Sequence, residues 1–185
     1  MVKNKLVNWL VKRSGKEYSP KQRLLAILFL GVPLFMVILP FVLFIISGPL
    51  DKLLGFQKLM IEPFNFIISL ILAFAGWLIA MWSIYLQFKI GRGTPAPPFP
   101  TQKLLTNGPY KYCRNPMLLG LFIIYLGLGL WLNSLSWLIL VLLGIGLFWV
   151  YTKLIEEKEL EVRFGKDYID YKKRTPFLIP RIKRK

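Results

Sequence analysis

Four apolar runs constrain this chain more than any other feature, because each is long enough, or nearly long enough, to form a membrane helix. They cover residues 24–47, 61–88, 117–132 and 136–154. A helix needs about 20 apolar residues to cross roughly 30 Å of hydrocarbon, and only the third run is clearly shorter. Hydrophobic residues make up 55% of the 185 residues, more than a typical soluble domain carries. The runs therefore predict an all-α polytopic membrane helix bundle with about four transmembrane helices.

The spacing of the runs predicts how the chain is organised. The dipeptide Asn133-Ser134 separates the last two runs, and so short a linker allows only a tight turn between antiparallel helices. We therefore expect three regions. The first is a basic amphipathic segment at residues 1–23, and the second is a pair of membrane helices at residues 24–90. The third, at residues 91–185, is a core that contains a loop, the helical hairpin and a cytoplasmic C-terminal helical segment.

Positive charge predicts the orientation of the bundle. Of the 25 Lys and Arg residues, only Lys52 and Lys58 lie between the first two runs, and the remaining 23 flank the runs on the opposite side. Cytoplasmic segments of membrane proteins carry the excess of Lys and Arg, so both termini are predicted to be cytoplasmic. The same residues predict attraction to anionic lipid headgroups. Nucleic-acid binding is disfavoured, because the basic residues cluster beside the apolar runs.

The first 23 residues predict a helix that lies in the membrane interface. This segment lacks the continuous apolar core of a cleavable signal. Its apolar residues recur at helical spacing opposite basic residues, with Val2, Leu6, Trp9 and Leu10 on one face and Lys5, Lys12 and Arg13 on the other. Such a pattern is typical of an interfacial anchor.

Two residue types that bind metals and carry protons are scarce in this chain. It has one cysteine, Cys113, and no histidine. An intramolecular disulfide and a site built from several thiolates are therefore excluded. Histidine-dependent general-base catalysis and histidine-ligated metals are excluded as well, so no metal site is expected.

A segment rich in proline and glycine follows the second run. Residues 91–100 contain four prolines and two glycines and cannot form a regular helix. Extended proline-rich backbone is stiff and solvated, which suits either a flap over a pocket or a linker. The residues after it carry enough apolar and aromatic surface to dock on the bundle, namely Leu104, Leu105, Tyr110 and Tyr112.

The start of the third run has two interpretations. Asn is a preferred N-cap and Pro is favoured at the first helical position, so Asn115-Pro116 predicts a helix start. The exposed N–H groups of a helix N-terminus also bind carboxylates and phosphates, and Arg114 adds positive charge beside them. The segment therefore fits a helix cap, an anion site, or both.

Two adjacent carboxylates, Glu156 and Glu157, follow the last run on a face otherwise filled with positive charge. On a continuing helix, Glu157 would lie near Glu161 and Glu159 would pair with Arg163, which describes a solvated, ion-paired helix. A cationic ligand group would explain their place beside the membrane. The hairpin returns these carboxylates to the face on which the third run starts. An anion site and a cation site would then suit a zwitterionic amino acid.

Together these segments resemble the superfamily of isoprenylcysteine carboxyl methyltransferases and phospholipid methyltransferases. The family pattern is Arg-His-Pro-x-Tyr-x-Gly, an apolar hairpin, Glu-Glu, and then Phe-Gly-x-x-Tyr-x-x-Tyr. The matching segments are GPYKYCRNPMLLG at residues 108–120, Glu156-Glu157, and FGKDYIDYKKRTP at residues 164–176. The resemblance covers roughly residues 91–180.

The resemblance implies a membrane-embedded methyltransferase that uses S-adenosylmethionine, whose amino-acid end is a zwitterion. Glu156 would bind the amino group of this cofactor, and Glu157 would be a paired carboxylate. No catalytic residue is assigned, and Arg114 and Glu157 are the candidates. A sulfonium is already a strong methyl donor, so the protein mainly aligns and desolvates the acceptor. The implied cofactor-binding residues are Gln102 and Lys103 through their backbone, and Leu104, Leu105, Tyr110, Asn115, Pro116, Met117, Leu118 and Glu156.

Departures from the family pattern leave the methyl acceptor open. Asn115 replaces the usual His, and Leu118 replaces the usual Tyr. Thr152, with Lys153 next to it, stands where prenylcysteine methyltransferases carry an arginine that resembles a ligand of the substrate carboxylate. The expected acceptor is lipophilic: an isoprenoid, a prenylcysteine-like compound, a phospholipid amine or a small thiol. A non-enzymatic membrane module that binds anionic lipids is the alternative from another class, and the oligomeric state is open.

Glycines and tryptophans in the hairpin have local interpretations. Gly127-Leu-Gly129 permits close helix packing, and it also invites comparison with a cofactor-binding glycine motif of phospholipid methyltransferases. Trp131 and Trp137 lie near the predicted turn of the hairpin, where tryptophan is typical of an anchor at the membrane interface.

Overall fold

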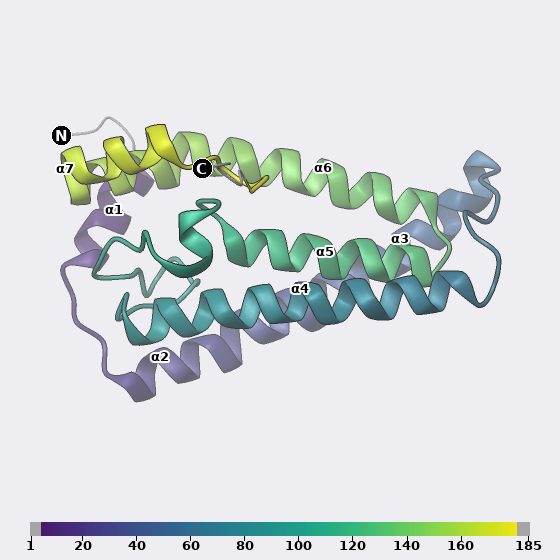
Figure 1. Cartoon of the computed structure of the whole chain (residues 1–185), viewed down its shortest axis with the longest axis horizontal. Coiled ribbons are helices and arrows are strands. Elements are labelled where there is room, and N and C mark those ends of the chain that lie inside the picture. Colours follow the sequence, from purple (N-terminus) through teal and green to yellow (C-terminus); the bar gives the residue numbers. More distant parts are fainter. Residues whose placement is uncertain (1–4, 181–185) are drawn as a thin grey trace, which may run out of the picture.

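The structure is a computed structural model that describes residues 5–180, and all regular elements in that range are helical. Long helices run side by side, and the chain segments between α4 and α5 gather at the end of the bundle where α1 and α7 lie (Figure 1). The elements are α1 (Lys5–Ser14), α2 (Pro20–Ala26), η1 (Ile27–Gly31), η2 (Pro33–Ile38), α3 (Leu39–Leu54), α4 (Phe64–Lys89), η3 (Gly108–Lys111), α5 (Pro116–Trp131), α6 (Leu135–Tyr151), η4 (Thr152–Glu156) and α7 (Glu157–Arg174).

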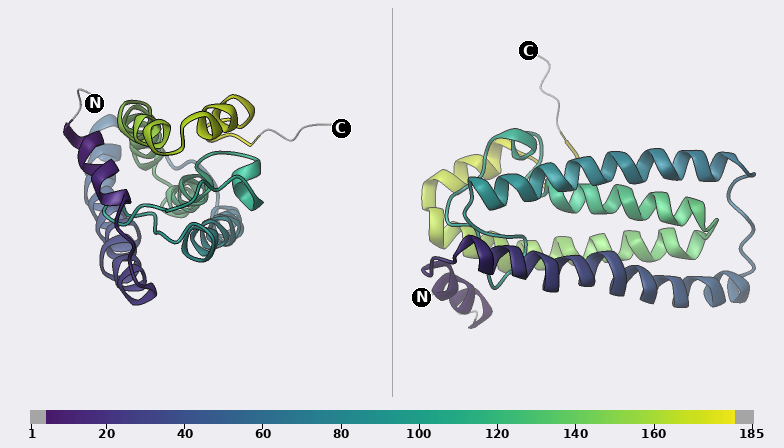
Figure 2. Two further views of the ribbon diagram at one scale, coloured as in Figure 1. Left: turned by 90° about the vertical axis from the view of Figure 1, so that its left-hand side faces the viewer. Right: turned by 90° about the horizontal axis from the view of Figure 1, so that it is seen from below.

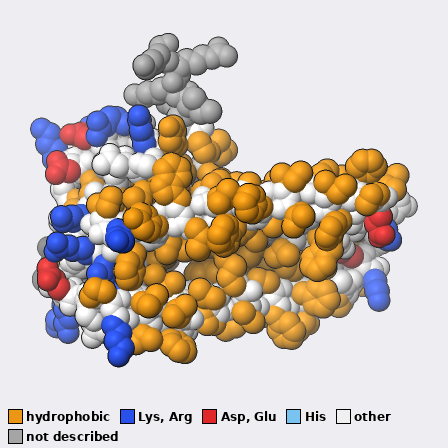
Figure 3. Space-filling model, turned by 60° about the horizontal axis from the view of Figure 1, so that its bottom comes forward, with side chains coloured by type: hydrophobic (Ala, Val, Ile, Leu, Met, Phe, Trp, Pro, Cys, Tyr) orange, Lys and Arg blue, Asp and Glu red, His pale blue; other side chains and the backbone are white. Residues whose placement is uncertain are grey.

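The predicted membrane bundle is confirmed. Three helices in the described residues are long and apolar enough to cross a membrane, and they span Pro20–Leu54, Phe64–Lys89 and Leu135–Arg174. The fourth, α5, has 16 residues and is short, as its apolar run predicts. It lies between α4 and α6 and is antiparallel to both (Figure 2). Charged and apolar side chains occupy different parts of the surface, as the charge pattern predicts. Most Lys and Arg side chains lie at one end, and apolar side chains cover the rest (Figure 3).

The first long helix, formed by α2, η1, η2 and α3, is longer than the predicted run of residues 24–47. It continues through Pro33 and Pro40, because two π-helical stretches shift its hydrogen bonds by one residue there. Pro49 lies farther along, inside α3. In this register the N–H of residue 40 would bond to the carbonyl of Phe35, but proline has no N–H. The hydroxyl of Tyr125 on α5 donates to that carbonyl instead. Because Pro40 leaves the carbonyl of Phe35 without a backbone donor, this carbonyl can accept a hydrogen bond from α5.

The interface between α4 and α5 is the most extensive between any two elements of the described chain. Glycines make the close approach possible: a Cβ atom on Gly76 would lie 2.5 Å from the carbonyl oxygen of Gly120. Gly127 packs in the same way against the carbonyl of Ser69. The packing interpretation of the hairpin glycines is therefore confirmed at Gly127, as expected for helices in lipid.

We expect Gly76→Ala to lower the free energy of unfolding by about 1–3 kcal/mol, because the methyl group would force two backbones apart. Gly144→Ala is the matched control, since no atom lies within 4 Å of a Cβ built there, and it should leave stability almost unchanged. Thermal unfolding in detergent, followed by tryptophan fluorescence, measures both variants. Equal losses in the two variants would contradict the packing argument.

The apolar core is centred on Tyr125, Trp137 and Val141. The indole N–H of Trp137 donates to the carbonyl of Tyr125 at 2.8 Å, and the side chain is 1% exposed. The prediction that Trp137 is an interfacial anchor was therefore wrong. Trp131 is 54% exposed, as its prediction requires. The difference arises because Trp137 faces α5, which folds back on it across the hairpin turn.

Helix α1 packs against α7 and η4 instead of lying free of the bundle. Its buried residues are Val7 and Leu10, whereas Leu6 and Trp9 remain exposed. The predicted apolar face is therefore only partly correct, because the side that meets α7 is rotated toward Val7. Val2 lies outside the described residues. Leu6 and Trp9 keep an apolar surface that suits the membrane interface.

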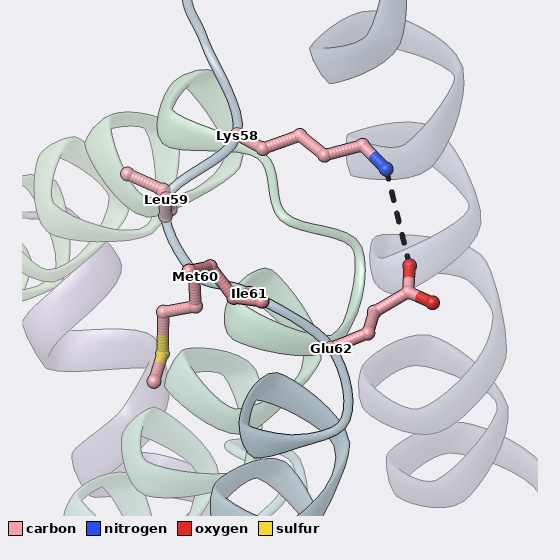
Figure 4. A pocket seen from close by; sticks show the side chains of 5 residues that line it. All are labelled: Lys58, Leu59, Met60, Ile61 and Glu62. Carbon is pink, nitrogen blue, oxygen red and sulfur yellow. Dashed lines mark ion pairs between the residues drawn. The ribbon is translucent and has the colours of Figure 1, made fainter.

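At the opposite end of the bundle, the segment between α3 and α4 forms a shallow hollow of about 400 Å³ lined by residues 58–62. Lys58 and Glu62 form an exposed ion pair at 3.9 Å there (Figure 4). Asn133 in the hairpin turn donates to the carbonyl of Met60 at 3.2 Å, and the carboxylate of Asp51 accepts from the N–H of Ser136 at 2.8 Å. These bonds fix the hairpin turn, and they lie far from the polar cluster described next.

Candidate functional site

A buried cluster of charged side chains joins α5 to α7 at the end of the bundle that carries the excess of Lys and Arg. The guanidinium of Arg114 donates to the carboxylate of Glu157 at 2.8 Å and to the hydroxyl of Tyr168 at 3.2 Å. Glu157 also pairs with Lys153 at 3.3 Å and with Lys172. The Glu157 side chain is 2% exposed, so three cations surround one buried carboxylate.

Arg114 therefore forms an ion pair with Glu157 of the same chain, although its sequence position also fitted an anion site. Burial alone would lower the pKa of the Arg114 guanidinium, but its hydrogen bond with Glu157 and the charge of that residue raise the pKa above its ordinary value. Lys172 bridges Glu157 and Glu161, which explains how these two carboxylates lie near each other on one helix. The predicted pair of Glu159 and Arg163 is present at 2.7 Å.

The C-terminal strap, defined here as residues 175–177, lies across the start of α5. The backbone N–H of Arg114 donates to the carbonyl of Pro176 at 2.9 Å, and that of Asn115 donates to the carbonyl of Phe177 at 3.1 Å. The side chain of Arg114 donates to the carbonyl of Thr175 at 3.1 Å. The strap therefore fixes the two residues that precede α5.

Asn115 occupies the N-cap position of α5 and Pro116 the first helical position, as predicted. The Asn115 side chain makes no capping hydrogen bond, however, so the expected side-chain cap is wrong. The N–H groups of Met117 and Leu118, which such a cap would serve, have no hydrogen-bond partner among the described residues. The helix N-terminus therefore presents unsatisfied donors.

Glu156 differs from its neighbour Glu157 in its burial and in its partners within the described chain. Its carboxylate accepts a hydrogen bond from the hydroxyl of Thr152 at 3.2 Å, and it forms no ion pair within residues 5–180. The side chain is half-buried. A half-buried carboxylate without a cation is costly unless a positively charged group joins it. Because Thr152 is itself buried, its hydroxyl holds Glu156 in one orientation.

The segment before α5 docks on the bundle as predicted. Leu105 and Tyr110 are buried, and the hydroxyl of Tyr110 accepts a hydrogen bond from the Gln87 amide on α4 at 2.7 Å. The carbonyl of Tyr110 accepts from the hydroxyl of Tyr171 on α7 at 2.7 Å. Tyr112 is the exception, since it is 43% exposed. Tyr110 therefore ties α4 to α7 beside the start of α5.

The other predicted cofactor residues lie along the same segment. The Gln102 side chain donates to the carbonyl of Lys16 at 3.3 Å, and its N–H donates to the carbonyl of Gly91. Lys103 is exposed, whereas Leu104 borders an open cavity of about 650 Å³ between this segment and α7. The wall of this cavity is mostly charged, formed by Leu104, Thr106, Asp167, Asp170, Lys173 and Arg174.

Residues 64–167 match the sequence model of the family described as phospholipid methyltransferase. The chain belongs to this family. The matched range begins at α4 and ends in α7, so it contains the Tyr110 segment, the hairpin and both glutamates. The first long helix lies outside the match.

Curated proteins similar to parts of this chain agree with that family. The chain is 33% identical over 85 residues to "Protein-S-isoprenylcysteine O-methyltransferase" of Mus musculus and of Rattus norvegicus, which covers 45% of this chain and 29% of each relative. It is 31% identical over 80 residues to "Nickel-cobalt-cadmium resistance protein NccN" of Alcaligenes xylosoxydans xylosoxydans, which covers 43% of this chain and 37% of that protein. The matched segment therefore spans about a third of the length of these relatives. No solved structure shows significant similarity.

Membership in the phospholipid methyltransferase family, together with the long apolar helices, makes the chain an integral membrane protein. The proline-rich loop of this family member is fastened to the bundle. Thr94 is buried, and a Cβ on Gly93 would collide with the backbone of Thr101. The carbonyl of Thr101 accepts a hydrogen bond from Arg163 on α7. The loop therefore packs over the end of the bundle where Tyr110 and Arg114 lie.

Cys113 lies three residues before the first residue of α5 and is 1% exposed. Burial raises the pKa of its thiol to about 11. The thiol is therefore neutral near pH 7, which leaves it a poor nucleophile.

Several residues of the site were not predicted from the sequence to contact the site residues. Thr152 orients Glu156, Gln87 positions Tyr110, and Thr175 accepts from Arg114. Thr152 was visible only as a departure from the family pattern. Gln87 and Thr175 act across 23 and 61 residues of chain, so no local pattern could have identified them.

Proposed function

We propose that this protein is a membrane methyltransferase that uses S-adenosylmethionine to methylate a lipophilic acceptor at the charged end of the bundle. The observation that carries the proposal is the contrast between the two adjacent glutamates. Glu157 is surrounded by cations, whereas Glu156 is half-buried, oriented by Thr152 and has no ion pair in the described chain. Family membership supports the reaction class.

The residues present fit the amino-acid end of this cofactor. Glu156 would accept hydrogen bonds from the ammonium group. The unsatisfied N–H groups of Met117 and Leu118, at the positive end of the α5 dipole, would bind the carboxylate. Leu105 and Tyr110 would supply apolar and aromatic surface. Asn115 and Pro116 would form the floor, with Gln102 and Lys103 at the edge of the loop and Leu104 beside the open cavity.

S-adenosylmethionine supplies an activated methyl group, so the protein needs no covalent intermediate. The role of its own residues is to align the acceptor and exclude water. Arg114 and Glu157 would act as positioning residues, because their ion pair and the C-terminal strap hold the start of α5 against α7. The neutral thiol of Cys113 takes no part in this scheme.

The acceptor is proposed by class only. The relatives from mouse and rat are named for S-isoprenylcysteine, which supports a lipophilic acceptor with a polar end. Thr152, which takes the place of the family arginine, hydrogen-bonds Glu156 instead of facing a substrate carboxylate. A phospholipid amine, an isoprenoid or a lipophilic thiol therefore remains in the tested set beside prenylcysteine.

We also propose that the charged end of the bundle is cytoplasmic and that residues 91–185 form the methyltransferase core, of which 181–185 lie outside the described residues. The excess of Lys and Arg at that end supports the orientation (Figure 3). The segment before α5, the first turn of α5 and η4 supply all residues assigned to the cofactor in this core.

Calorimetry of the purified full-length protein with S-adenosylmethionine tests the proposal. We expect saturable binding at one site per chain, followed by transfer of a labelled methyl group to at least one member of an acceptor panel. The panel contains a prenylated cysteine, phosphatidylethanolamine, an isoprenoid acid and a lipophilic thiol. Absence of cofactor binding would overturn the proposal and favour the non-enzymatic lipid-binding module. Binding without transfer to any of the four would overturn the lipophilic acceptor class.

A further inference from the structure

The first long helix stands away from its neighbours over much of its length. No side chain is buried in η1 or η2, which cover residues 27–31 and 33–38. Farther along, α3 packs against α6. Seen from below, α4 and the first long helix lie on opposite sides of the bundle, with α5 and α6 behind them (Figure 2). A space-filling view shows an apolar hollow along this face (Figure 3), called here the α2–α4 hollow.

Two hydrogen bonds join the first long helix to its neighbours across this hollow. The guanidinium of Arg23 on α2 donates to the carbonyl of Phe88 at the end of α4, at 2.7 Å. Deeper in the bundle, Tyr125 donates to the carbonyl of Phe35. Twelve residues of helix separate these two bridges, which is about 18 Å and close to the thickness of one leaflet. The hollow between them therefore has the depth of a lipid chain.

Arg23 is an unusual cation for this position. It is 8% exposed, yet it pairs with no carboxylate in the described chain. Its guanidinium lies 4.7 Å from the ring of Phe88, and its Nε–H is buried without a hydrogen-bond partner. Capping the last turn of α4 uses only one of its donors. A buried cation without an anion is costly and, beside a membrane, indicates a ligand.

The position of Arg23 indicates which anion that would be. It immediately precedes Leu24, the first residue of the apolar run, and so lies at the depth of lipid phosphates. Lys89 follows Phe88 at the end of α4, which adds positive charge at the mouth of the hollow. Positively charged segments at this depth attract anionic lipids.

We propose that the α2–α4 hollow binds one anionic phospholipid of the leaflet at the charged end of the bundle. Its phosphate would contact Arg23, and one acyl chain would run along η1 and η2 toward the Tyr125 bridge. This lipid is distinct from the methyl acceptor, and the proposal does not depend on methyl transfer. Phosphatidylglycerol has the required charge and carries no amine to methylate, so it separates the two.

Native mass spectrometry of the purified full-length protein tests the site with phosphatidylglycerol and phosphatidylcholine of the same acyl chains. We expect the wild type to retain one phosphatidylglycerol in preference to phosphatidylcholine. Arg23→Gln should reduce that retention about tenfold, the effect of losing a hydrogen-bonded charge. Lys21→Gln is the matched control, because it removes the same charge two residues away on an exposed side chain.

A second measurement does not depend on how well Arg23→Gln folds. Ligands that bind the folded state raise its melting temperature, so phosphatidylglycerol should stabilise the wild type and Lys21→Gln more than phosphatidylcholine does at equal mole fraction. Equal stabilisation by the two lipids would overturn the proposal. It would also be overturned if Arg23→Gln and Lys21→Gln retained phosphatidylglycerol equally well.

Discussion

Glu156→Gln is expected to weaken the binding of S-adenosylmethionine by roughly ten- to hundredfold, which corresponds to about 1.5–3 kcal/mol for hydrogen bonds between charged groups. The amide keeps the size of the side chain and its contact with Thr152, but it removes the negative charge that would face the cofactor ammonium. The fold should persist, because Glu156 takes part in no ion pair of the described chain. Calorimetric titration of wild type and variant measures the difference.

Glu161→Gln is the matched control for this prediction. Glu161 lies on α7 at the same end of the bundle, but it pairs with Lys172 at 2.9 Å and is partly exposed. Its substitution should leave cofactor affinity within about twofold, since exposed ion pairs contribute little. If Glu156→Gln bound the cofactor as tightly as Glu161→Gln, the assignment of Glu156 would be wrong, although binding itself would stand.

Arg114→Gln is expected to destabilise the protein by about 3 kcal/mol, near the lower end for breaking a buried ion pair, because Lys153 and Lys172 still compensate Glu157. The substitution also removes the donors to Tyr168 and Thr175. The start of α5 should then lose its anchor, so cofactor affinity should fall together with stability. Thermal unfolding in detergent, with and without S-adenosylmethionine, measures both effects.

Two further variants test the reasoning for Arg114. Lys173→Gln removes a cation from an exposed pair with Asp170 at 3.7 Å, so it should change stability by less than about 1 kcal/mol. Arg114→Lys keeps the charge but carries all its donors on one nitrogen, whereas Arg114 uses both Nε and Nη1 to reach its partners, so it should restore only part of the loss. An Arg114→Gln protein as stable as Lys173→Gln would show that the buried cluster does not hold the site together.

The local features of this chain could be predicted from the sequence because short-range chemistry determines them. The apolar runs, the tight hairpin turn and the helix start at Asn115-Pro116 all lie where expected. The pair of Glu159 and Arg163 follows from helical spacing alone. The predicted boundaries differ from the structure in the first long helix, which is longer than its apolar run and accommodates Pro33 and Pro40 through π-helical turns.

The faces of the helices were much harder to predict. In a soluble helix the polar side marks the surface, but a membrane helix is apolar on all sides, so hydropathy does not distinguish a lipid-facing residue from a buried one. Hydropathy therefore places Trp137 at the interface although it lies in the core. On the amphipathic helix α1, the buried side includes Val7 because that side meets α7. Only the contacts with α5 and α7 show which side is buried.

The sequence by itself determined that this chain is a membrane bundle of four apolar helices, with a charge bias toward one end and two glutamates after the last helix. Only the tertiary structure decided what those glutamates do, since Arg114 reaches Glu157 across 43 residues of chain. That contact depends on how α5 packs against α6 in the hairpin and on where the strap crosses the start of α5. Such distances are set by the packing of whole helices, which no local stretch of sequence encodes.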